Sequence, residues 1–365
     1  MSRGLSLLMT TDAIGGVWQY SLDLAAALVP LGVTTTLVTL GPRATAAQRG
    51  EAADAGIALI ESGLPIDWLC DGPEPIHAAG ERIAAIAAAR KVDLVQLNMP
   101  TLGAQVRFAV PVVAVMHGCI ATWWDAAHGS TLPSEFRWQR TATHQALIAA
   151  DAVVAPSVTH AGEVARHYGL VHAPLAIHNG RTPLVEPAAT APARRLFTAG
   201  RLWDLVKDTA LLDAVAARVP VPFRAAGATR GPHGETVTPH HLVLLGQLDT
   251  GALTAELAAR PIFVSAARFE PFGLAVLEAA AAGCPLILSD IPTFRELWDG
   301  AATFVAVGDE HGYVAAIDAL LDDPARAVTL GDTARARAAR YTPAATAAQM
   351  AALYAQLVDT RRVAA

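Results

Sequence analysis

Two carboxylates, Glu270 and Glu278, stand on either side of a stretch that predicts an anion-binding helix start. A proline and Gly273 break the chain just after the first glutamate, and apolar residues at helical spacing follow over 274–281. The unpaired N–H groups and the positive dipole end near Phe272 and Gly273 would attract a phosphate. A phosphate flanked by two carboxylates suits a ligand with hydroxyl groups at both ends, as in a nucleotide sugar.

The position of Glu278 favours a functional role over a structural one. A capped helix with a solvated glutamate is the ordinary interpretation of such a stretch. Here Glu278 lies between Leu277 and the first of four consecutive alanines, so its charge falls on a largely buried helix. A buried charge is costly unless it is paired, and this cost tilts the interpretation toward function.

Two cations, Arg201 and Lys207, occur in the segment GRLWDLVK, which follows the predicted strand 196–199. At the carboxyl end of a strand, a guanidinium fork and a compact ammonium can both meet a diphosphate. Lys91 and Lys207 are the only lysines among 27 basic residues, so this lysine departs from a strong arginine bias. The structural alternative is a surface lysine at the start of a helix.

Strand-like and helix-like segments alternate along the chain, which indicates parallel sheets covered by helices. They form two sets, separated by the proline- and alanine-rich stretch 182–194, which lacks periodicity and is the natural linker. At 365 residues the chain is long enough for two domains of ordinary size. We expect an α/β fold with one domain over 1–182, a second over 183–342, and a terminal helix in 343–365.

The chain opens with a strand over 5–9, a loop that contains Gly15 and Gly16, and a helix over 17–31. This is the opening of a nucleotide-binding fold. The loop lacks the G-x-G-x-x-G pattern, and no acidic residue ends the strand-like segment 33–40 to hold a ribose, so dinucleotide binding is disfavoured. On its own, the glycine pair is equally consistent with a tight turn.

His117 follows the strand-like segment 112–116, at the sheet edge where open α/β folds bind ligands. A single histidine in such a place is more often structural. Trp123 and Trp124 come soon after it in a predicted loop, where neighbouring side chains point in different directions. Flat aromatic surface there suits stacking on a sugar or an aglycone, and ordinary packing is the equally weighted alternative.

Composition excludes several classes of protein. The hydrophobic fraction of 53% indicates a globular chain, and no apolar run reaches membrane-spanning length. The N-terminus lacks a secretory hydrophobic segment, and the three cysteines are widely separated, so we expect a cytoplasmic protein. A net charge of −6 argues against nucleic-acid binding, but not against brief contact with a membrane surface.

The residues also argue against a metal site. No D-x-D triplet occurs, and the pairs His240 with His241 and His160 with His167 lack carboxylates at ligand spacing. The cysteines are too widely spaced for a cysteine-based zinc site. We therefore expect no metal cofactor.

The stretch from Glu270 to Glu278 resembles the E-x7-E signature of retaining glycosyltransferases of the GT-B fold, family 4, and the resemblance extends over nearly the whole chain. It implies two Rossmann-like doubly wound domains facing a central cleft, with the last helix crossing back to the first domain. It also implies that Glu270 holds donor-sugar hydroxyls, that Glu278 binds the ribose and that His117 faces the donor sugar. The remaining donor contacts would come from Gly15, Gly16, Phe272, Gly273 and Leu274 at the diphosphate and from Leu248 near the base.

The chain departs from the family pattern in places. Two alanines precede the motif where the family often has Pro-Ser. Lys207 follows Arg201 by six residues, whereas the family's G-R-L-x-x-x-K spacing is five, so the loop is longer by one. The dipeptide Asn179-Gly180 resembles the family's N-G-V-D hinge, but Arg181 stands in place of the valine, and an ordinary turn would give the same dipeptide.

These observations predict a metal-independent, retaining glycosyltransferase of the hexosyltransferase class that moves a sugar from a nucleoside-diphosphate sugar to a hydroxyl acceptor. Arg201, Lys207 and the helix start after Glu270 would stabilise the leaving diphosphate. Acceptor binding is assigned to the first domain, through Trp123 and Trp124. The alternatives are a nucleotide-sugar epimerase or phosphorylase, and a catalytically silent nucleotide-sugar-binding protein or partner-dependent subunit. The residues name neither the base, the sugar, the acceptor nor the oligomeric state.

Overall fold

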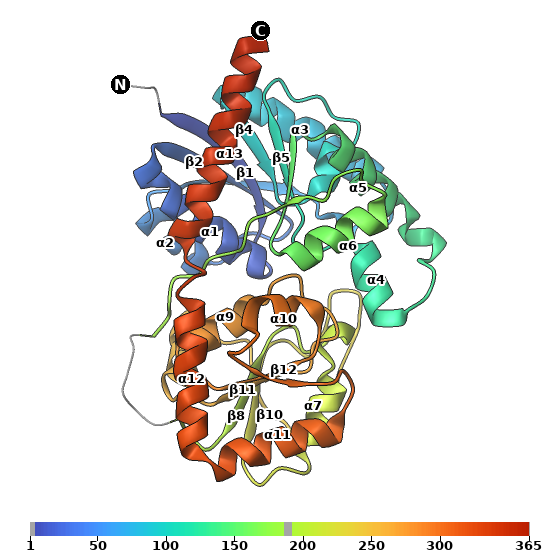
Figure 1. The fold of residues 1–365 in the computed structure, drawn as a ribbon. Helices are drawn as coiled ribbons and strands as arrows, with labels where there is room; N and C mark the ends of the chain where they lie inside the picture. The colour runs from blue at the N-terminus through green and yellow to red at the C-terminus, as the bar shows by residue number, and fades with distance from the viewer. Residues whose placement is uncertain (1–3, 186–191, 365) are drawn as a thin grey trace. The chain divides into compact units, whose positions relative to one another are not determined.

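The computed structural model describes residues 4–185 and 192–364, and part of the predicted linker, residues 186–191, lies outside them. The chain divides into two units (Figure 1). The first unit runs to Asp125 and includes Gly129–Gly180 and everything from Thr342 on, whereas Ala126–His128 and Arg181–Tyr341 group with the second unit. Each unit holds one parallel sheet with helices on its faces, as the alternation of segments predicts.

The sheet of the first unit has the strand order β3-β2-β1-β4-β5-β6-β7, with parallel pairing throughout. Its strands are β1 (Leu5–Asp12), β2 (Val33–Leu40), β3 (Ala58–Leu64), β4 (Leu94–Leu97), β5 (Val112–Val115), β6 (Ala152–Ala155) and β7 (Leu175–Ala176). The chain order reverses direction between β1 and β4, which is the kind of switch point beside which α/β folds bind ligands.

The helices that accompany this sheet are α1 (Gly16–Leu28), α2 (Ala46–Asp54), α3 (Glu74–Arg90), α4 (Ile120–His128), α5 (Arg137–Ala149), α6 (Val158–Tyr168) and α13 (Pro343–Ala364). Short 3-10 turns are η1 (Val29–Leu31), η2 (Asp67–Leu69), η3 (Pro100–Gly103) and η4 (Ser134–Phe136). Helix α6 has well-defined bounds, because Ser157 caps its start and Gly169, in the left-handed region, ends it.

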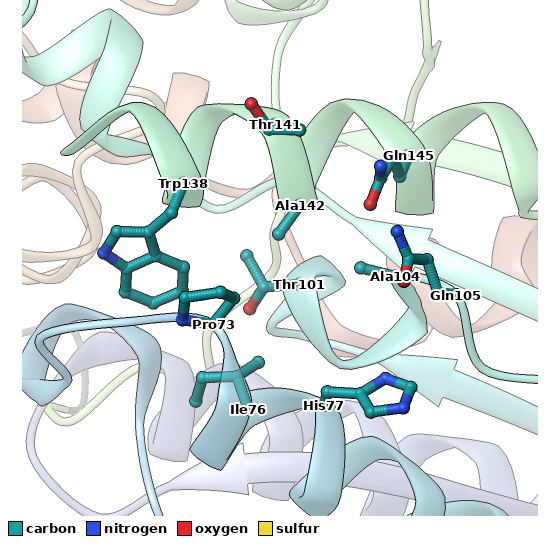
Figure 2. A pocket seen from close by; sticks show the side chains of 10 residues that line it. All are labelled: Pro73, Ile76, His77, Thr101, Ala104, Gln105, Trp138, Thr141, Ala142 and Gln145. Carbon is teal, nitrogen blue, oxygen red and sulfur yellow. The ribbon is translucent and has the colours of Figure 1, made fainter. Parts of the chain in front are cut away.

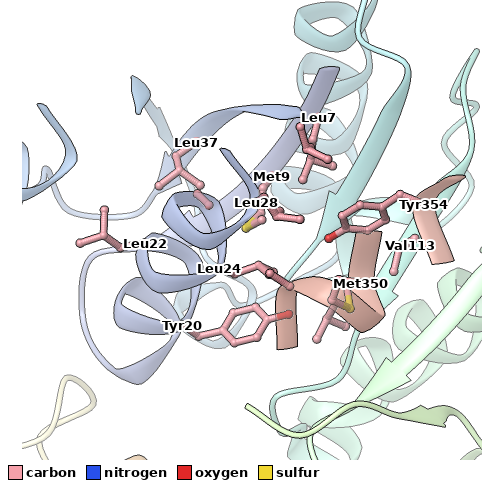
Figure 3. Close-up of a cluster of buried hydrophobic side chains, with 14 of the residues drawn as sticks. Leu7, Met9, Tyr20, Leu22, Leu24, Leu28, Leu37, Val113, Met350 and Tyr354 are labelled. Carbon is pink, nitrogen blue, oxygen red and sulfur yellow. The ribbon is translucent and has the colours of Figure 1, made fainter. Parts of the chain in front are cut away.

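The C-terminal helix α13 completes the core of the first unit. Met350 and Tyr354 of α13 are fully buried among side chains of α1, such as Leu24 and Leu28, on one face of the sheet (Figure 3). Gly180 lies against the backbone just before α13, because a Cβ on it would come within 2.1 Å of the Thr342 carbonyl. Only glycine allows this close approach of the two chain segments.

The sheet of the second unit has the order β10-β9-β8-β11-β12-β13 and is also parallel. Its strands are β8 (Leu196–Ala199), β9 (Phe223–Ala226), β10 (Val243–Gly246), β11 (Ile262–Ser265), β12 (Leu286–Ser289) and β13 (Thr303–Val305). Its helices are α7 (Thr209–Ala216), α8 (Thr250–Ala258), α9 (Leu274–Ala281), α10 (Pro292–Trp298), α11 (Glu310–Asp322) and α12 (Pro324–Ala338), with the 3-10 turn η5 (Leu205–Lys207). Apolar side chains from these elements, including Phe263, Phe294 and Trp298, are fully buried.

Several elements differ from the predicted ones. The segment after His117 is the helix α4, so the prediction that Trp123 and Trp124 lie in a loop is wrong. The start of α4 is capped by the thiol of Cys119, which accepts from the Thr122 N–H, and cysteine is not among the residues that usually signal a helix start. Helix α10 and the three-residue strand β13 were also not predicted, since they are too short to show periodicity.

Candidate active site

The predicted cation Lys207 and the predicted carboxylate Glu270 contact each other directly. Lys207 ends η5, in the loop after β8, and Glu270 follows the neighbouring strand β11. The ammonium Nζ lies 2.5 Å from Glu270 Oε2, and both side chains keep about a fifth of their surface exposed. The sheet topology therefore brings a cation and a carboxylate together at the carboxyl edge of the second sheet.

Arg201 lies in the same loop and is more exposed than Lys207. Its Nη2 donates to Asp204 Oδ2 at 2.9 Å, and its guanidinium carbon lies 5.7 Å from the centre of the Trp203 ring. The Arg201 side chain is 56% exposed, whereas Asp204 is 2% exposed and also accepts from the Val206 N–H. One buried carboxylate thus fixes the loop and holds one side of the guanidinium, while most of the arginine remains open to solvent.

The start of helix α9 has the backbone expected of an anion site. Gly273 is the N-cap, with φ of 92°, and as a glycine it has no side chain to cap the first N–H groups of the helix. A Cβ on Gly273 would lie 3.2 Å from Glu270 Cγ and 3.3 Å from the Phe294 ring, so both conformation and space favour glycine here. Phe272 is buried edge-on against Tyr341, at 5.7 Å between ring centres, and Leu274 is partly buried.

Glu278 has a specific partner in Arg181. The Arg181 Nε donates to Glu278 Oε1 at 2.7 Å, and the two side chains are 8% and 13% exposed. This pairing resolves the cost of a charge on a buried helix. It also gives a role to the residue that replaces the family's valine at the predicted hinge, which sequence reasoning had noted only as a departure.

Leu248 follows the edge strand β10 and is partly buried against the same apolar cluster as Phe272 and Leu277. Its side chain therefore serves packing. Asp249, the next residue, caps α8 by accepting from the Ala252 N–H at 2.8 Å. The structure thus places Leu248 in the turn between β10 and α8.

In the first unit, Gly15 and Gly16 join β1 to α1, and both are exposed. Gly15 has φ of −160°, an extended conformation that any residue adopts, and a Cβ on it would meet no atom within 4 Å. Neither turn geometry nor local crowding therefore demands glycine at this position.

His117 follows β5 and lies at the end of a buried polar network. Its Nε2 is 3.1 Å from Asn98 Oδ1, and its ring packs edge-on against Tyr20, with 4.5 Å between ring centres. Withdrawal from water, with a smaller contribution from nearby His160, lowers the pKa of His117 to about 3. The imidazole is therefore neutral at physiological pH and cannot serve as a cation for phosphate.

Trp123 and Trp124 have unequal surroundings on α4. Their rings lie edge-on at 6.1 Å, and both side chains are partly buried. Trp124 also packs on Phe136, at 5.5 Å between ring centres, and its Nε1 donates to Ser130 Oγ at 3.2 Å. These contacts make Trp124 in part a packing residue.

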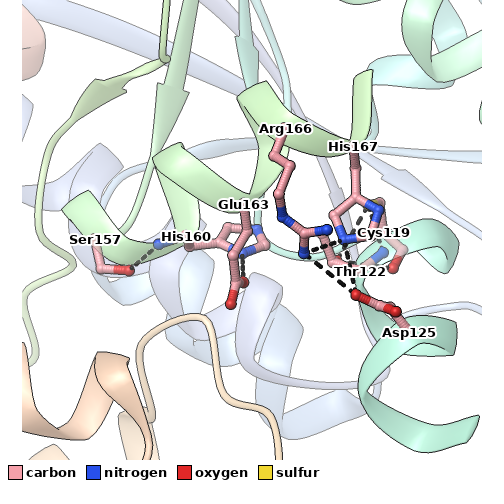
Figure 4. A network of polar contacts seen from close by, with 8 residues as sticks. All are labelled: Cys119, Thr122, Asp125, Ser157, His160, Glu163, Arg166 and His167. Atoms are coloured by element: carbon pink, nitrogen blue, oxygen red, sulfur yellow. Dashed lines mark hydrogen bonds and ion pairs between the residues drawn. The ribbon is translucent and has the colours of Figure 1, made fainter. Parts of the chain in front are cut away.

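Polar contacts connect α4 to α6 (Figure 4). Asp125 Oδ2 lies 3.2 Å from Arg166 Nη2 and 3.3 Å from His167 Nε2. On the next turns of α6 toward its start, His160 Nδ1 lies 3.4 Å from Glu163 Oε2. Helix α4, which carries the tryptophans, is thus joined to α6 by the exposed ion pair of Asp125 with Arg166 and by the contact of Asp125 with His167.

A pocket of about 270 Å³ lies apart from all of these residues, between α3, η3 and α5 (Figure 2). Trp138 stands at one end, and Gln105 and Gln145 lie near each other at the other end. None of the predicted site residues lines it.

Residues 4–185 and 192–364 contain neither a metal-ligand cluster nor a membrane-spanning helix. Within that range no three histidine, cysteine, aspartate or glutamate side chains gather as a metal site would require. Nor does any helix there combine the length and the apolar character needed to cross a membrane.

Sequence reasoning missed Asn98 and Gln96 altogether. Both are buried polar residues at the end of β4, an otherwise apolar strand. A glutamine inside the strand LVQL was the available signal, because a buried polar side chain implies a hydrogen-bond partner.

Comparison with known proteins gives matches to glycosyltransferases. Residues 14–183 match the model of Glycosyltransferase Family 4, and residues 235–337 match that of Glycosyl transferases group 1. Glycogen synthase of Mycobacterium tuberculosis is 29% identical over 310 residues, covering 78% of this chain and 67% of that protein. D-inositol 3-phosphate glycosyltransferase 2 of Catenulispora acidiphila is 27% identical, covering 97% of this chain and 92% of that protein.

The fold comparison extends over nearly the whole chain. The structure of Anabaena HepE in complex with UDP and glucose aligns with a TM-score of 0.73 and 17% identity, covering 96% of this chain and 99% of that one. Together with the two parallel sheets, these matches identify the fold as GT-B. The chain belongs to family 4 of the glycosyltransferases.

Proposed function

We propose that this glycosyltransferase moves a sugar from a nucleoside diphosphate to a hydroxyl acceptor, with retention of configuration and without a metal ion. The observation that carries the proposal is the pair Lys207 and Glu270 beside the open start of α9. A cation, a carboxylate and the N–H groups of a helix start are what a sugar diphosphate needs at one place.

The chemistry assigned to this group is stabilisation of the departing diphosphate. Lys207 is paired with Glu270, at 2.5 Å. A bound diphosphate would take over the ammonium as its partner, and Glu270 would then accept hydrogen bonds from hydroxyls of the sugar. Arg201, which is mostly exposed, adds a second cation to the developing charge. Because these cations do the work of a metal, we propose that none is required.

Glu278 is proposed to bind the ribose of the nucleotide. Its carboxylate has a second oxygen beyond the one that accepts from Arg181, and a carboxylate offers four acceptor sites in all. The arginine and a ribose hydroxyl can therefore share the group. Uracil is the first base to test, because HepE was solved with UDP.

Four residues of the first unit complete the proposal. The backbone at Gly15 and Gly16 is exposed and can approach a phosphate, and a Cβ on Gly15 would meet no atom within 4 Å. Neutral His117 contacts the donor sugar. Acceptor binding is assigned to the first unit, with Trp123 as its aromatic contact.

The test is calorimetric titration with UDP, GDP and ADP, followed by turnover of the sugar nucleotide of the base that binds. We expect one nucleotide to bind preferentially, transfer to survive EDTA, and NMR of the product to show the donor's anomeric configuration. A product of inverted configuration would contradict the retaining mechanism. Turnover that EDTA abolishes and Mg²⁺ or Mn²⁺ restores would contradict metal independence. Binding with neither transfer nor donor hydrolysis would identify a nucleotide-sugar-binding protein instead.

A further inference from the structure

A series of hydrogen bonds through two buried amide side chains connects the C-terminal helix to His117. Tyr354 of α13 donates its hydroxyl to Gln96 Oε1, and Gln96 Nε2 donates to Asn98 Oδ1 at 2.9 Å. Asn98 Oδ1 is also the atom that meets His117 Nε2, at 3.1 Å. Of these residues, Tyr354, Gln96 and Asn98 are at most 8% exposed, so their hydrogen-bond partners are protein groups.

The contacts of Asn98 fix which of its two amide atoms faces His117. Its Nδ2 lies 2.9 Å from the carbonyl oxygen of Thr10, which can only accept. The same Nδ2 lies 3.0 Å from the hydroxyl of Ser21, whose hydrogen is committed to the Val17 carbonyl at 2.7 Å. Two independent acceptors therefore identify the amide nitrogen of Asn98. Its oxygen must be the atom that faces His117.

The oxygen of an amide accepts and never donates, so the hydrogen between Asn98 and His117 belongs to the histidine. We infer that Asn98 is a positioning residue, which holds neutral His117 in the tautomer with hydrogen on Nε2 and leaves Nδ1 as a hydrogen-bond acceptor. The ring thus recognises a hydroxyl donor, such as a sugar hydroxyl. Phosphate and carboxylate oxygens, which are acceptors at neutral pH, do not match it.

This role rests on the proposed function only in naming the hydroxyl as that of the transferred sugar. The tautomer itself follows from the network. The titratable groups around the ring are Tyr20, which packs on it, and His160, which disfavours its protonation. Neither supplies a negative charge that would favour imidazolium at neutral pH.

The tautomer is measured directly in the unmodified protein. Two-bond ¹H–¹⁵N correlation spectra of the protein labelled with ¹⁵N-histidine distinguish protonated from bare ring nitrogens, and His117→Gln assigns the signal. We expect a protonated Nε2 and a bare Nδ1 from pH 5 to 8. Hydrogen on Nδ1, or a doubly protonated ring at pH 7, would overturn the inference whatever the enzyme transfers.

The role of Asn98 in turnover is tested by Asn98→Ala, with Tyr354→Phe as a control in the same hydrogen-bond network. Asn98→Ala should change the His117 spectrum and lower kcat about tenfold, the scale of one misdirected hydrogen bond. Tyr354→Phe should lower the melting temperature but leave the spectrum and kcat unchanged, since Thr10 and Ser21 still orient Asn98. Should Asn98→Ala not fold, Asn98→Asp substitutes for it: its negative charge should stabilise the protonated imidazole, raise the pKa of His117 and shift the pH profile of kcat.

The outcomes separate the two proposals. If the wild type transfers sugar and Asn98→Ala alters the spectrum without altering kcat, the hydroxyl-recognition role fails and the transferase proposal stands. If the wild type transfers nothing while the spectrum is as expected, the transferase proposal fails and the tautomer assignment stands.

Discussion

The ion pair between Arg181 and Glu278 allows stability and nucleotide binding to be separated in one experiment. At 8% and 13% exposure the two charges have little water to stabilise them, so breaking this ion pair is costly. Arg181→Met should therefore cost roughly 3 kcal/mol, near the lower end for a buried pair, because some exposure remains. For a unit of this size that loss corresponds to a fall of about 6–12 °C in the melting temperature.

Glu278→Gln should behave differently. The amide keeps an acceptor for Arg181 Nε and loses only the charge, which exchanges a charge-assisted hydrogen bond for a neutral one and costs roughly 1–1.5 kcal/mol. Nucleotide affinity should fall about tenfold, because the ribose loses its charged partner. Arg181→Met should leave that affinity intact, since it releases the carboxylate from a competing partner.

The assay is thermal unfolding of the two single variants and the double variant, with calorimetric titration of the nucleotide that binds the wild type. The double variant should be more stable than the sum of the single effects by at least about 1 kcal/mol, the scale expected for contacting charges. Asp290→Asn is the matched control: its Oδ1 also lies 2.7 Å from an arginine Nε, but the pair with Arg295 is 42% and 46% exposed. It should change the melting temperature little.

Two results would refute this reasoning. Additive single effects would show that Arg181 and Glu278 are not coupled. Equal losses of nucleotide affinity in Arg181→Met and Glu278→Gln would show that the ribose does not depend on the carboxylate in particular.

Four further predictions follow from the same contacts. Lys207→Ala should lower kcat/KM by the equivalent of roughly 2–4 kcal/mol, the effect of losing one preorganised cation, and near-normal steady-state turnover would remove this lysine from the site. Glu270→Gln should lower kcat about 10²-fold while calorimetry shows nucleotide affinity nearly unchanged. Trp123→Ala should raise the acceptor KM several-fold, whereas Trp124→Ala should also lower the melting temperature, because it loses its contact with Phe136; unchanged acceptor kinetics in Trp123→Ala would return that residue to a packing role. Because burial depresses the folded-state pKa of His117 to about 3, the unfolded chain binds the extra proton below about pH 6.5, so stability should fall as pH drops from 6.5 toward 3. His117→Gln should reduce that slope in acid titrations followed by circular dichroism, and an unchanged slope would contradict the assignment.

The sequence by itself determined the architecture and the chemical types at the site. Alternating periodicity predicted two parallel sheets because buried parallel strands need apolar residues on both faces and crossover helices between them. The start of α9 was predictable because Gly273 is required by local backbone geometry, at φ of 92°. The need of the Glu278 carboxylate for a charged or hydrogen-bonding partner followed from its apolar neighbours.

Local signals also explain what the sequence could not determine. Helix α4 begins with a cysteine cap, so the two tryptophans seemed to lie in a loop, and β13 is too short to show a period. Whether such short segments form a helix or a strand depends on contacts with residues that are distant in the sequence.

The partners of the site residues were decided only by the tertiary structure. Lys207 meets Glu270 because β8 and β11 are adjacent in the sheet, although 63 positions separate the two residues. Glu278 meets Arg181 across 97 positions, and Asn98 receives its direction from Thr10 across 88. A residue's type states what it requires, a charge or a hydrogen bond, but the order of the strands decides which distant group supplies it.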